Sequence, residues 1–354
     1  MLRIKNLPFY WRFEKNLICK DEIPALYDFI FEIDNELKLI IEKKDPTLIN
    51  ILNNVYKENS NIGYMIDGHN LSNHYGTDYL NFLTSIVGNF AQKKIIDVGC
   101  GGCTLLDKLA QENAIVIGVD PSPIAKIAAK NKSIPLINDF YKSGTLANHD
   151  ADLITQMDVF EHVYDPLSIL KAESQSLSHD GIIAINVPDC EFSIKNGDIS
   201  LAIHQHVNMF TRYSICKLVE NAGLHVSELK LSDYGAAIFC AASKNKKMLK
   251  FHSNDFKEQI KWSEEFFLKA VKRIEKFKSF LKKIDDFRFF DNNILWHNNY
   301  LDGIPKKIEN FDDLIKNPPN KLIIMSNTFG KDIKDQVNSI LKNKIDIFLQ
   351  DDIF

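Results

Sequence analysis

The stretch that decides the fold is Ile95-Ile96-Asp97-Val98-Gly99-Cys100-Gly101-Gly102-Cys103. It begins as an apolar strand, passes through a turn rich in glycine, and is followed by a helical pattern over Leu105–Ala110. Glycine lacks a Cβ atom, so a ligand can approach the backbone of this turn closely and a positive φ costs little. The pattern predicts a strand–turn–helix unit with a ligand at the turn.

The same alternation of apolar runs and helical stretches continues along the chain. Compact apolar runs followed by turn residues lie at 94–98, 114–119, 153–157 and 182–187. The helical patterns between them are what a parallel βαβ sheet requires. Two further strands, at 226–231 and 236–242, are expected to form an antiparallel pair at one sheet edge. The sequence therefore predicts an α/β fold.

An acidic residue ends the strand that follows the glycine turn. The run Ile115-Val116-Ile117-Gly118-Val119 leads directly to Asp120. A carboxylate at this place can accept hydrogen bonds from both hydroxyls of a ribose. We therefore expect a nucleoside-bearing cofactor at the carboxyl ends of the parallel strands. A dinucleotide fingerprint would place a third glycine where this chain has Thr104.

This combination of motifs resembles the class I S-adenosylmethionine-dependent methyltransferases. The residues that carry the resemblance are Asp97-Val98-Gly99-Cys100-Gly101 and Asp120, and it covers about 78–243. It implies a Rossmann-like seven-stranded sheet and S-adenosyl-L-methionine as the cofactor. It also implies that Asp97 orients the amino end of the cofactor, and that the methionine part lies against Gly99, Cys100 and Gly101.

The resemblance implies further cofactor contacts along the same edge of the sheet. These contacts are Tyr75, Asp120, Pro121, Asn138, Asp139, Met157 and Asp158. Asp120 would bind the ribose hydroxyls, while Pro121 and the turn Asn138-Asp139-Phe140 would lie near adenine. Met157 and Asp158 belong to the exit of the fourth strand, beside the methyl group. Tyr75 would reach the sulfonium, and the alternative for it is ordinary helix capping and packing.

Cys100 and Cys103 form a C-x-x-C pattern, which can indicate redox chemistry or half of a metal site. The sequence has six cysteines but no second pair of this kind, and the spacing falls inside the cofactor loop. We therefore predict that the two cysteines fill a crowded turn and that the chain has no metal site.

Candidate catalytic residues follow from the chemistry of methyl transfer. Transfer from a sulfonium is an in-line displacement, and a hydroxyl or carbon acid must also lose a proton. Histidine suits this role because its pKa lies near neutrality. His206 and His204 lie after the strand 182–187, and Glu161 is a second candidate acid or base. The alternatives are structural: the histidines pack or cap, and Glu161 caps the helix that begins at Pro166.

The acceptor is addressed by a second resemblance. The histidine segment resembles the E-H-x-x-Y-F turn of sugar C-methyltransferases, whose histidine matches His206 and whose aromatic residue matches Phe210. The acid and the upstream tyrosine of that turn are replaced by Gln205 and Ile203, and the family's four-cysteine zinc module is not recognisable. C- and O-methylation therefore both stay open.

The expected activity is methylation of a small molecule, a nucleotide-linked sugar or surface-glycan precursor. One alternative is O- or N-methylation of a lipid, a quinone or another small metabolite. The other alternative is a non-catalytic subunit that binds the cofactor only to stabilise a complex.

Four parts are predicted along the chain. They are a helical cap region at 1–77, the S-adenosylmethionine-binding domain at 78–245, a long amphipathic helix at 246–284 and a small α/β domain at 285–354. In the first part, apolar residues at spacings of three and four predict a helix from Pro24 to Ile41, and a shorter helix carries Leu48 to Tyr56. The apolar stripe of the long helix is either intramolecular packing or the seam of a homodimer.

The composition excludes several classes of protein. The chain is 45% hydrophobic and 25% charged with a formal charge of −4, so it lacks the basic excess that nucleic-acid binding uses. No run approaches the ~20 apolar residues of a membrane helix, so no membrane insertion is expected. The scattered cysteines and the absence of an apolar leader predict a cytoplasmic location.

Overall fold

The structure is a computed structural model of the 354-residue chain. It describes residues 1–8, 26–58, 70–147, 149–233, 235–245, 256–281, 287–291, 297, 307–326, 330–342 and 344–353. The chain divides into two compact units. The first unit comprises Phe31–Phe192 and His204–Glu264 together with Met1, and the second comprises Leu2–Ile30, Ser193–Ile203 and Glu265–Phe354.

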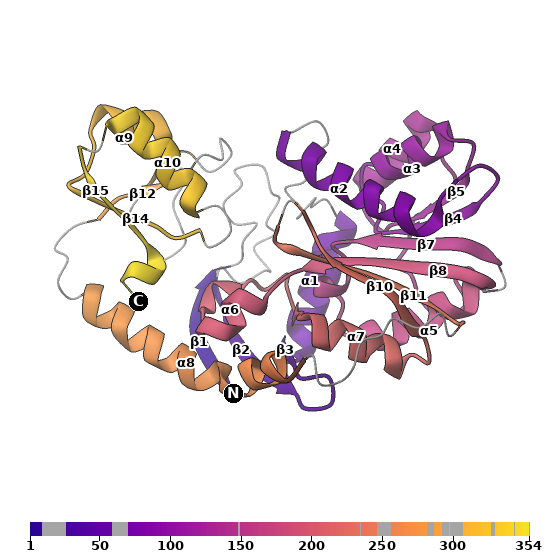
Figure 1. Ribbon diagram of the computed structural model, residues 1–354, viewed down its shortest axis with the longest axis horizontal. Coiled ribbons are helices and arrows are strands. Elements are labelled where there is room, and N and C mark those ends of the chain that lie inside the picture. The colour runs from indigo at the N-terminus through magenta and orange to yellow at the C-terminus, as the bar shows by residue number, and fades with distance from the viewer. Residues whose placement is uncertain are drawn as a thin grey trace. The chain divides into compact units, whose positions relative to one another are not determined.

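A seven-stranded sheet forms the centre of the first unit (Figure 1). Its strands, in spatial order, are β10 (His225–Leu231), β11 (Ala237–Ser243), β8 (Leu177–Pro188), β7 (Ala151–Met157), β4 (Lys94–Val98), β5 (Ile115–Val119) and β6 (Leu136–Ile137). The neighbours from β8 to β6 are parallel, whereas β11 runs antiparallel to both β8 and β10. The predicted α/β Rossmann-like sheet and its antiparallel edge pair are confirmed.

Helices cover both faces of this sheet (Figure 1). One face packs against α5 (Pro166–Ser176) and α7 (Arg212–Asn221), and the other packs against α2 (Asn70–Val87) and α3 (Thr104–Gln111). The adjoining α4 (Pro123–Lys132) packs on α3. Strands covered on both faces have no polar alternation, which explains why they read as continuous apolar runs.

The N-terminal part of the chain corrects a prediction. The helix predicted from Pro24 to Ile41 is wrong: from residue 26 onward, the described residues form the strands β2 (Leu26–Asp34) and β3 (Leu39–Glu42). Strand β3 pairs antiparallel with β2 and with β9 (Asn208–Met209). The strand β3 therefore connects this part of the first unit to the segment that carries the predicted catalytic histidines.

The physical reason lies in a turn that the helical spacing hid. The Asp34 carboxylate accepts hydrogen bonds from the backbone N–H groups of Glu36 and Leu37, both at 2.9 Å. Such local bonds favour a turn over a continuing helix. Phe29 and Phe31 are both fully buried, two residues apart, which is the period of a strand. Apolar residues are so frequent here that they fit both the helical period and the two-residue period of a strand. The turn at Asp34 decides in favour of two strands.

The shorter predicted helix is confirmed as α1 (Pro46–Glu58). The Asp45 carboxylate accepts hydrogen bonds from the backbone N–H groups of Thr47 and Leu48, at 2.8 and 3.2 Å. These bonds satisfy two of the N–H groups that a helix start leaves free. Leu48 and Leu52 are buried, so the helix packs through the apolar side that its spacing predicted.

The C-terminal elements also follow the sequence pattern. The long amphipathic helix is α8 (Lys257–Leu281), and the predicted βαβ unit consists of β14 (Lys321–Ile324), α10 (Gly330–Leu341) and β15 (Asp346–Leu349), with the two strands parallel. The remaining strands and α-helices are β1 (Leu2–Pro8), α6 (Glu191–Asn196), β12 (Phe289–Phe290), β13 (Ile308–Glu309) and α9 (Phe311–Lys316), and short 3-10 helices lie at Phe160–His162, Ile199–Leu201 and Gln350–Asp352. The four domain boundaries and the homodimer stay predictions.

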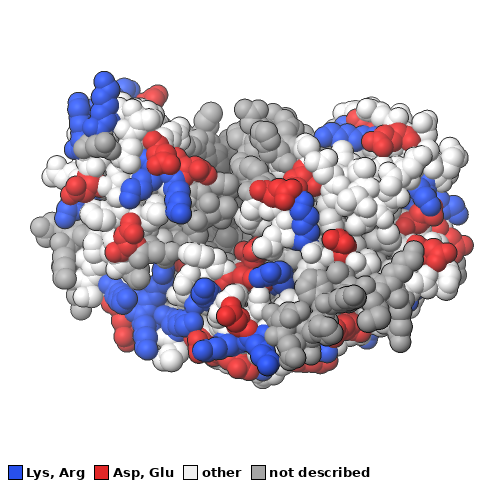
Figure 2. All heavy atoms as spheres, viewed as in Figure 1, with Lys and Arg blue, Asp and Glu red and all other residues white. Residues whose placement is uncertain are grey.

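Charged side chains of both signs are interspersed on the face shown in Figure 2. Along α8, for example, Lys269 forms an ion pair with Glu265 one turn away, at 3.0 Å. This pairing is typical of a solvated helix face. Within the described part of the chain, the helices are all too short or too polar to cross a membrane.

Candidate cofactor and acceptor site

The glycine loop after β4 takes a backbone shape that requires glycine. Gly99 has φ +75° and Gly101 has φ +46°, both in the left-handed region. A Cβ atom at Gly99 would lie 2.5 Å from Cγ2 of Val159, whereas one at Gly101 would meet no atom within 4 Å. Gly99 is therefore fixed by packing against the exit of β7, and the backbone at Gly101 borders open space where a ligand can approach.

The acid at the end of β5 holds this loop in place. The two carboxylate oxygens of Asp120 accept hydrogen bonds from the backbone N–H groups of Gly101 (2.9 Å) and Ser122 (2.7 Å). The Asn138 amide donates to the Asp120 carbonyl oxygen at 2.8 Å. A carboxylate has about four lone-pair positions, so roughly half of this capacity is left for the hydroxyls of a ribose. The structure thus brings together Gly101, Asp120 and Asn138, as the sequence predicts.

Asp97 lies at the end of β4 and is buried. Burial raises its pKa well above the usual range, and the nearby Cys103 and Asp120 act in the same direction. A cationic group brought to Asp97 would relieve this unfavourable burial of negative charge. The amino group of S-adenosylmethionine is such a cation, so the residues present fit the cofactor that the fold implies.

The cysteine pair packs as small residues in the same loop. The sulfur atoms of Cys100 and Cys103 lie 3.8 Å apart, no disulfide joins them, and both side chains are buried. A Cβ atom at Gly118 would lie 2.6 Å from the Cys100 sulfur, which shows how tightly β5 packs beneath the loop. The hydrogen bond with Cys103, and then burial, raise the pKa of the Cys100 thiol. Reactive cysteines need a lowered pKa, so this environment does not favour redox chemistry.

Asp139 differs from the other predicted cofactor residues. It lies on the surface, where its carboxylate accepts hydrogen bonds from the Lys142 ammonium and from the Phe140 backbone N–H, both at 2.8 Å. These two bonds lower the pKa of Asp139. Its side chain is therefore directed to local surface partners, and its contact with adenine stays a prediction.

The exit of β7 holds the predicted tyrosine. The Tyr75 hydroxyl donates to the Asp158 carboxylate at 2.9 Å and lies 3.1 Å from the side-chain oxygen of Asn186, at the end of β8. Burial raises the pKa of Asp158 to about 6. Sequence reasoning missed Asn186. The available signal was a polar residue near the end of an otherwise apolar buried strand.

Three further side chains form a group that we call the His–Glu cluster: Glu161, His162 and His206. Their ligand-type atoms all lie within 4.8 Å of one another, and Glu161 Oε1 is 3.6 Å from His162 Nε2. The ring centroids of His162 and His206 are 5.0 Å apart. The sequence predicted Glu161 and His206 as site residues but not His162. Its position directly after Glu161, in the turn that leaves β7, was the signal.

Glu161 is buried and the two histidines are half-buried, and this burial sets the charges of the three side chains. Burial lowers the pKa of His206 to about 3, with a smaller contribution from His162, and lowers the pKa of His162 to about 4. Burial raises the pKa of Glu161 well above its usual range. Both rings are therefore neutral at neutral pH. The near-neutral pKa expected for His206 from its residue type is wrong.

His204 occupies a different place from His206. Its side chain is buried, and its Nδ1 lies 2.8 Å from Glu42 Oε1 on β3. Burial raises the pKa of Glu42 to about 7, although the bond to His204 acts in the opposite direction. This pairing favours the structural alternative for His204, and its catalytic role stays an untested prediction.

Hydrogen bonds join the histidine segment to the turn that carries Glu161. The backbone N–H of Val207 donates to the Glu161 carbonyl at 2.6 Å. The Asn208 amide donates to the carbonyls of Phe160 (2.8 Å) and Val163 (2.6 Å). His206 is thus held beside Glu161 by the backbone on both of its sides, since Gln205 also accepts a bond from His162 (2.7 Å).

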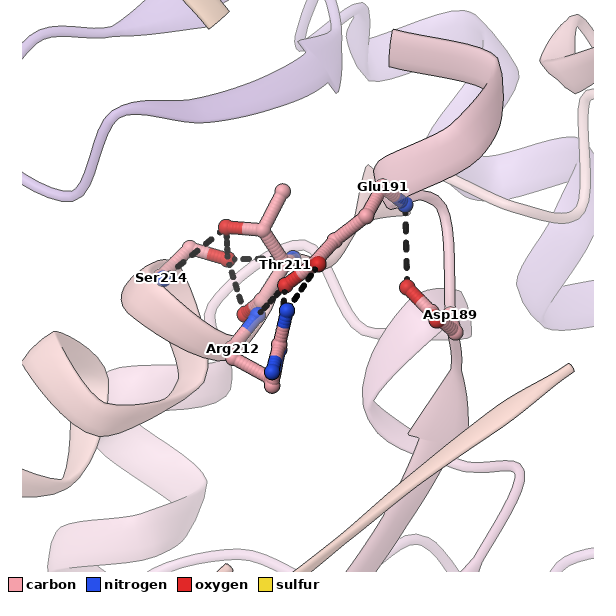
Figure 3. Close-up of polar contacts among 5 residues, drawn as sticks. All are labelled: Asp189, Glu191, Thr211, Arg212 and Ser214. Carbon is pink, nitrogen blue, oxygen red and sulfur yellow. Dashed lines mark hydrogen bonds and ion pairs between the residues drawn. The ribbon is translucent and has the colours of Figure 1, made fainter. Parts of the chain in front are cut away.

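The same segment is anchored where α7 begins (Figure 3). The Arg212 guanidinium makes two hydrogen bonds to the two Glu191 carboxylate oxygens, at 2.9 and 2.8 Å, and the Arg212 backbone N–H adds a third at 2.9 Å. The Glu191 N–H in turn donates to Asp189 at 2.9 Å. Thr211 and Ser214 form a capping box that starts α7. These contacts tie the end of the histidine segment to the end of β8.

The order of the strands, the glycine loop and the acidic residue Asp120 at the end of β5 together define the class I methyltransferase fold. Residues 69–229 match the family model described as "Methyltransferase domain". The chain therefore carries an S-adenosylmethionine-dependent methyltransferase domain, and S-adenosyl-L-methionine is its cofactor.

Three known proteins illustrate the similarity. A ubiquinone biosynthesis O-methyltransferase from Aeromonas salmonicida is 27% identical over 172 residues, which are 42% of this chain and 70% of that protein. The protein of the same name from Salmonella paratyphi A is 36% identical over 112 residues, 29% of this chain and 45% of that protein. The crystal structure of magnesium protoporphyrin IX methyltransferase from Synechocystis with bound cofactor is 15% identical, with a TM-score of 0.43, and covers 57% of this chain and all of that one. The chain spans about half the length of most of the curated relatives that it matches.

Proposed function

We propose that this protein transfers the methyl group of S-adenosylmethionine to a hydroxyl oxygen of a small, quinone-type molecule. The similarity to relatives named as O-methyltransferases of ubiquinone biosynthesis supports this acceptor over the nucleotide sugar that the histidine segment suggests. The observation that carries the proposal is the packing of Gly99 on Val159. This contact sets the cofactor loop against the turn that bears Glu161, so methyl donor and His–Glu cluster would adjoin.

Each residue has a task in this proposal. Bound S-adenosylmethionine supplies an electrophilic methyl group on a positively charged sulfur. Asp97 would hold the amino end and Asp120 the ribose, which fixes the position of the cofactor from two directions. Tyr75, held by Asp158, would lie on the sulfonium side. Alignment of donor and acceptor in this way accounts for much of the rate of an in-line displacement.

The His–Glu cluster would take charge of the acceptor proton. A hydroxyl must lose its proton as its oxygen attacks the methyl group. A neighbouring group within hydrogen-bond reach has to accept this proton or lower the pKa of the hydroxyl. His206 is neutral at neutral pH and so has a free ring nitrogen, but a pKa of about 3 makes it a weak base on its own. We therefore assign this step to the cluster as a whole.

Incubation of the full chain with methyl-labelled S-adenosylmethionine and two acceptors tests the proposal. One acceptor is a dihydroxyphenol with a short isoprenoid tail, and the other is a panel of nucleotide-linked sugars. We expect labelled methyl ether only in the phenol, and less of it with the Asp120→Ala variant when the cofactor is below saturation. Label in a sugar would contradict the proposed acceptor. Cofactor binding without transfer to either acceptor would contradict methylation of a quinone-type hydroxyl.

A further inference from the structure

We propose that the His–Glu cluster of Glu161, His162 and His206 binds one divalent cation of the zinc type. The donor set is two imidazole nitrogens and one carboxylate oxygen. Two histidines and one glutamate form a known set for catalytic zinc, which leaves a further coordination position open for substrate or water. The sequence led to the opposite expectation, because it offered no spacing motif that joins residue 206 to residues 161 and 162.

The distances fit a site that closes on its cation. Zinc bonds to nitrogen and oxygen are about 2.0–2.2 Å long, so ligand atoms of a tetrahedral site lie roughly 3.3–3.6 Å apart. Glu161 Oε1 and His162 Nε2 are already 3.6 Å apart. The group as a whole lies within 4.8 Å, so the remaining ligand atom has to move by only about 1 Å.

The orientation of His162 is that of a metal ligand. Its Nδ1 bonds to the Gln205 carbonyl oxygen at 2.7 Å, and since a carbonyl only accepts, Nδ1 carries the hydrogen. In the neutral ring this leaves the Nε2 lone pair directed toward Glu161. Metal-binding histidines almost always donate their other N–H to a carbonyl or carboxylate, which fixes both the tautomer and the ring orientation.

Two buried oxygen atoms at the cluster have no hydrogen-bond partner among the described residues. Glu161 Oε2 is buried and accepts no hydrogen bond from any described residue, and the nearby Tyr56 hydroxyl is likewise buried and unpaired among them. The Tyr56 ring lies 5.9 Å from that of His162. The His162 ring beside Glu161 is neutral, and among the described residues no lysine or arginine forms an ion pair with Glu161. Buried polar groups are normally satisfied, and a cation would satisfy the carboxylate and draw the three side chains together.

The position of the cluster suggests a role for the cation in catalysis. This role rests on the proposed function. Glu161 follows Val159 by two residues, and Val159 is the side chain that packs on Gly99 of the cofactor loop. A cation with an open position would therefore hold the acceptor hydroxyl beside the methyl donor. Coordination to a divalent cation lowers the pKa of a bound hydroxyl, which would help the acceptor to lose its proton.

Metal titration of the chelator-treated full chain tests this site. We expect calorimetry with zinc chloride to give one site per chain, and cobalt chloride to give visible absorption bands without thiolate charge transfer. Glu161→Gln and His206→Ala should each weaken zinc binding at least tenfold, while His179→Ala, at an exposed histidine, and Cys103→Ser should leave it unchanged. S-adenosylmethionine binding by each variant reports that it is folded.

Several results would overturn the cation site. These are absence of zinc binding in the wild-type chain, binding that survives both cluster variants, loss of binding in Cys103→Ser, or binding of magnesium but not zinc or cobalt. A chelator-treated chain that methylates the phenol at the full rate would contradict the cation's role and leave the proposed function standing. Absence of transfer with zinc bound would contradict the proposed function and leave the cation site standing.

Discussion

The cofactor loop and the histidine segment differ in where their contacts come from. Asp120 bonds to Gly101 and to Asn138, which lie 19 and 18 residues away from it in the chain. His162 bonds to Gln205 across 43 residues, and His204 bonds to Glu42 across 162. The first region is built from neighbouring strands and turns, whereas the second forms only when distant parts of the first unit meet.

The largest expected effect comes from removing the side chain of His206. His206→Ala should lower kcat by about 10²–10⁴, the usual range for loss of proton-transfer assistance. The dissociation constant of S-adenosylmethionine should barely change, because the cofactor loop is held by separate bonds. Steady-state kinetics with the phenolic acceptor, together with calorimetry, measures both quantities. Turnover near the wild-type value would show that His206 only packs, and that the histidine segment differs from the cofactor loop in structure but not in function.

Glu42 gives a pH test of the other histidine environment. The pKa of Glu42 is raised from 4.5 to about 7, so the folded chain keeps a proton that the unfolded chain releases. The resulting stability is fully present below pH 4.5 and is lost as pH rises through about 7. This loss amounts to about 3 kcal/mol of the free energy of unfolding.

Glu42→Gln isolates this effect. Glutamine cannot ionise but can still accept a hydrogen bond from His204, so the variant should match the wild-type chain near pH 4 and be more stable near pH 8. Urea unfolding at a series of pH values measures the difference. Parallel pH profiles, or a wild-type chain that gains stability with pH relative to the variant, would contradict a raised Glu42 pKa.

The smallest expected effect lies in the anchor of the histidine segment. Arg212→Lys keeps the charge but loses the two-pronged bond to Glu191, and should lower the free energy of unfolding by about 1 kcal/mol. Lys217→Gln is the matched control on the same helix, because it removes only the exposed pair with Glu220 and should cost at most about 0.5 kcal/mol. Thermal unfolding compares the two, and equal losses would show that the anchor is no stronger than a surface pair.

The cofactor side could be predicted from sequence because each requirement is local. A positive φ at Gly99, an acid at a strand end and an apolar run for each buried strand are all visible within a short window. The order of such strands is then limited by the rules for parallel sheets. A local motif does not fix the direction of a side chain: Asp139 matches the motif, but its carboxylate bonds to Lys142 on the surface.

The acceptor side could not be predicted in the same way. Glu42 directly follows a stretch whose spacing of apolar residues suited a helix. The turn at Asp34 makes this stretch a pair of strands instead and brings Glu42 to His204. The charge state of His206 was also hidden, since its pKa depends on burial beside His162 rather than on residue type. Tertiary contacts decide both properties, and a single sequence does not display them.

The central claim is that Asp120 binds the cofactor ribose at the edge of a methyltransferase sheet. Calorimetric titration of the wild-type, Asp120→Ala and Asp139→Ala chains with S-adenosylmethionine tests it most directly. We predict that Asp120→Ala weakens binding by about 1.5–3 kcal/mol, the scale of a lost charged hydrogen bond, and that Asp139→Ala has a smaller effect. Unchanged affinity in Asp120→Ala, or binding of NADH in place of S-adenosylmethionine by the wild-type chain, would contradict the account.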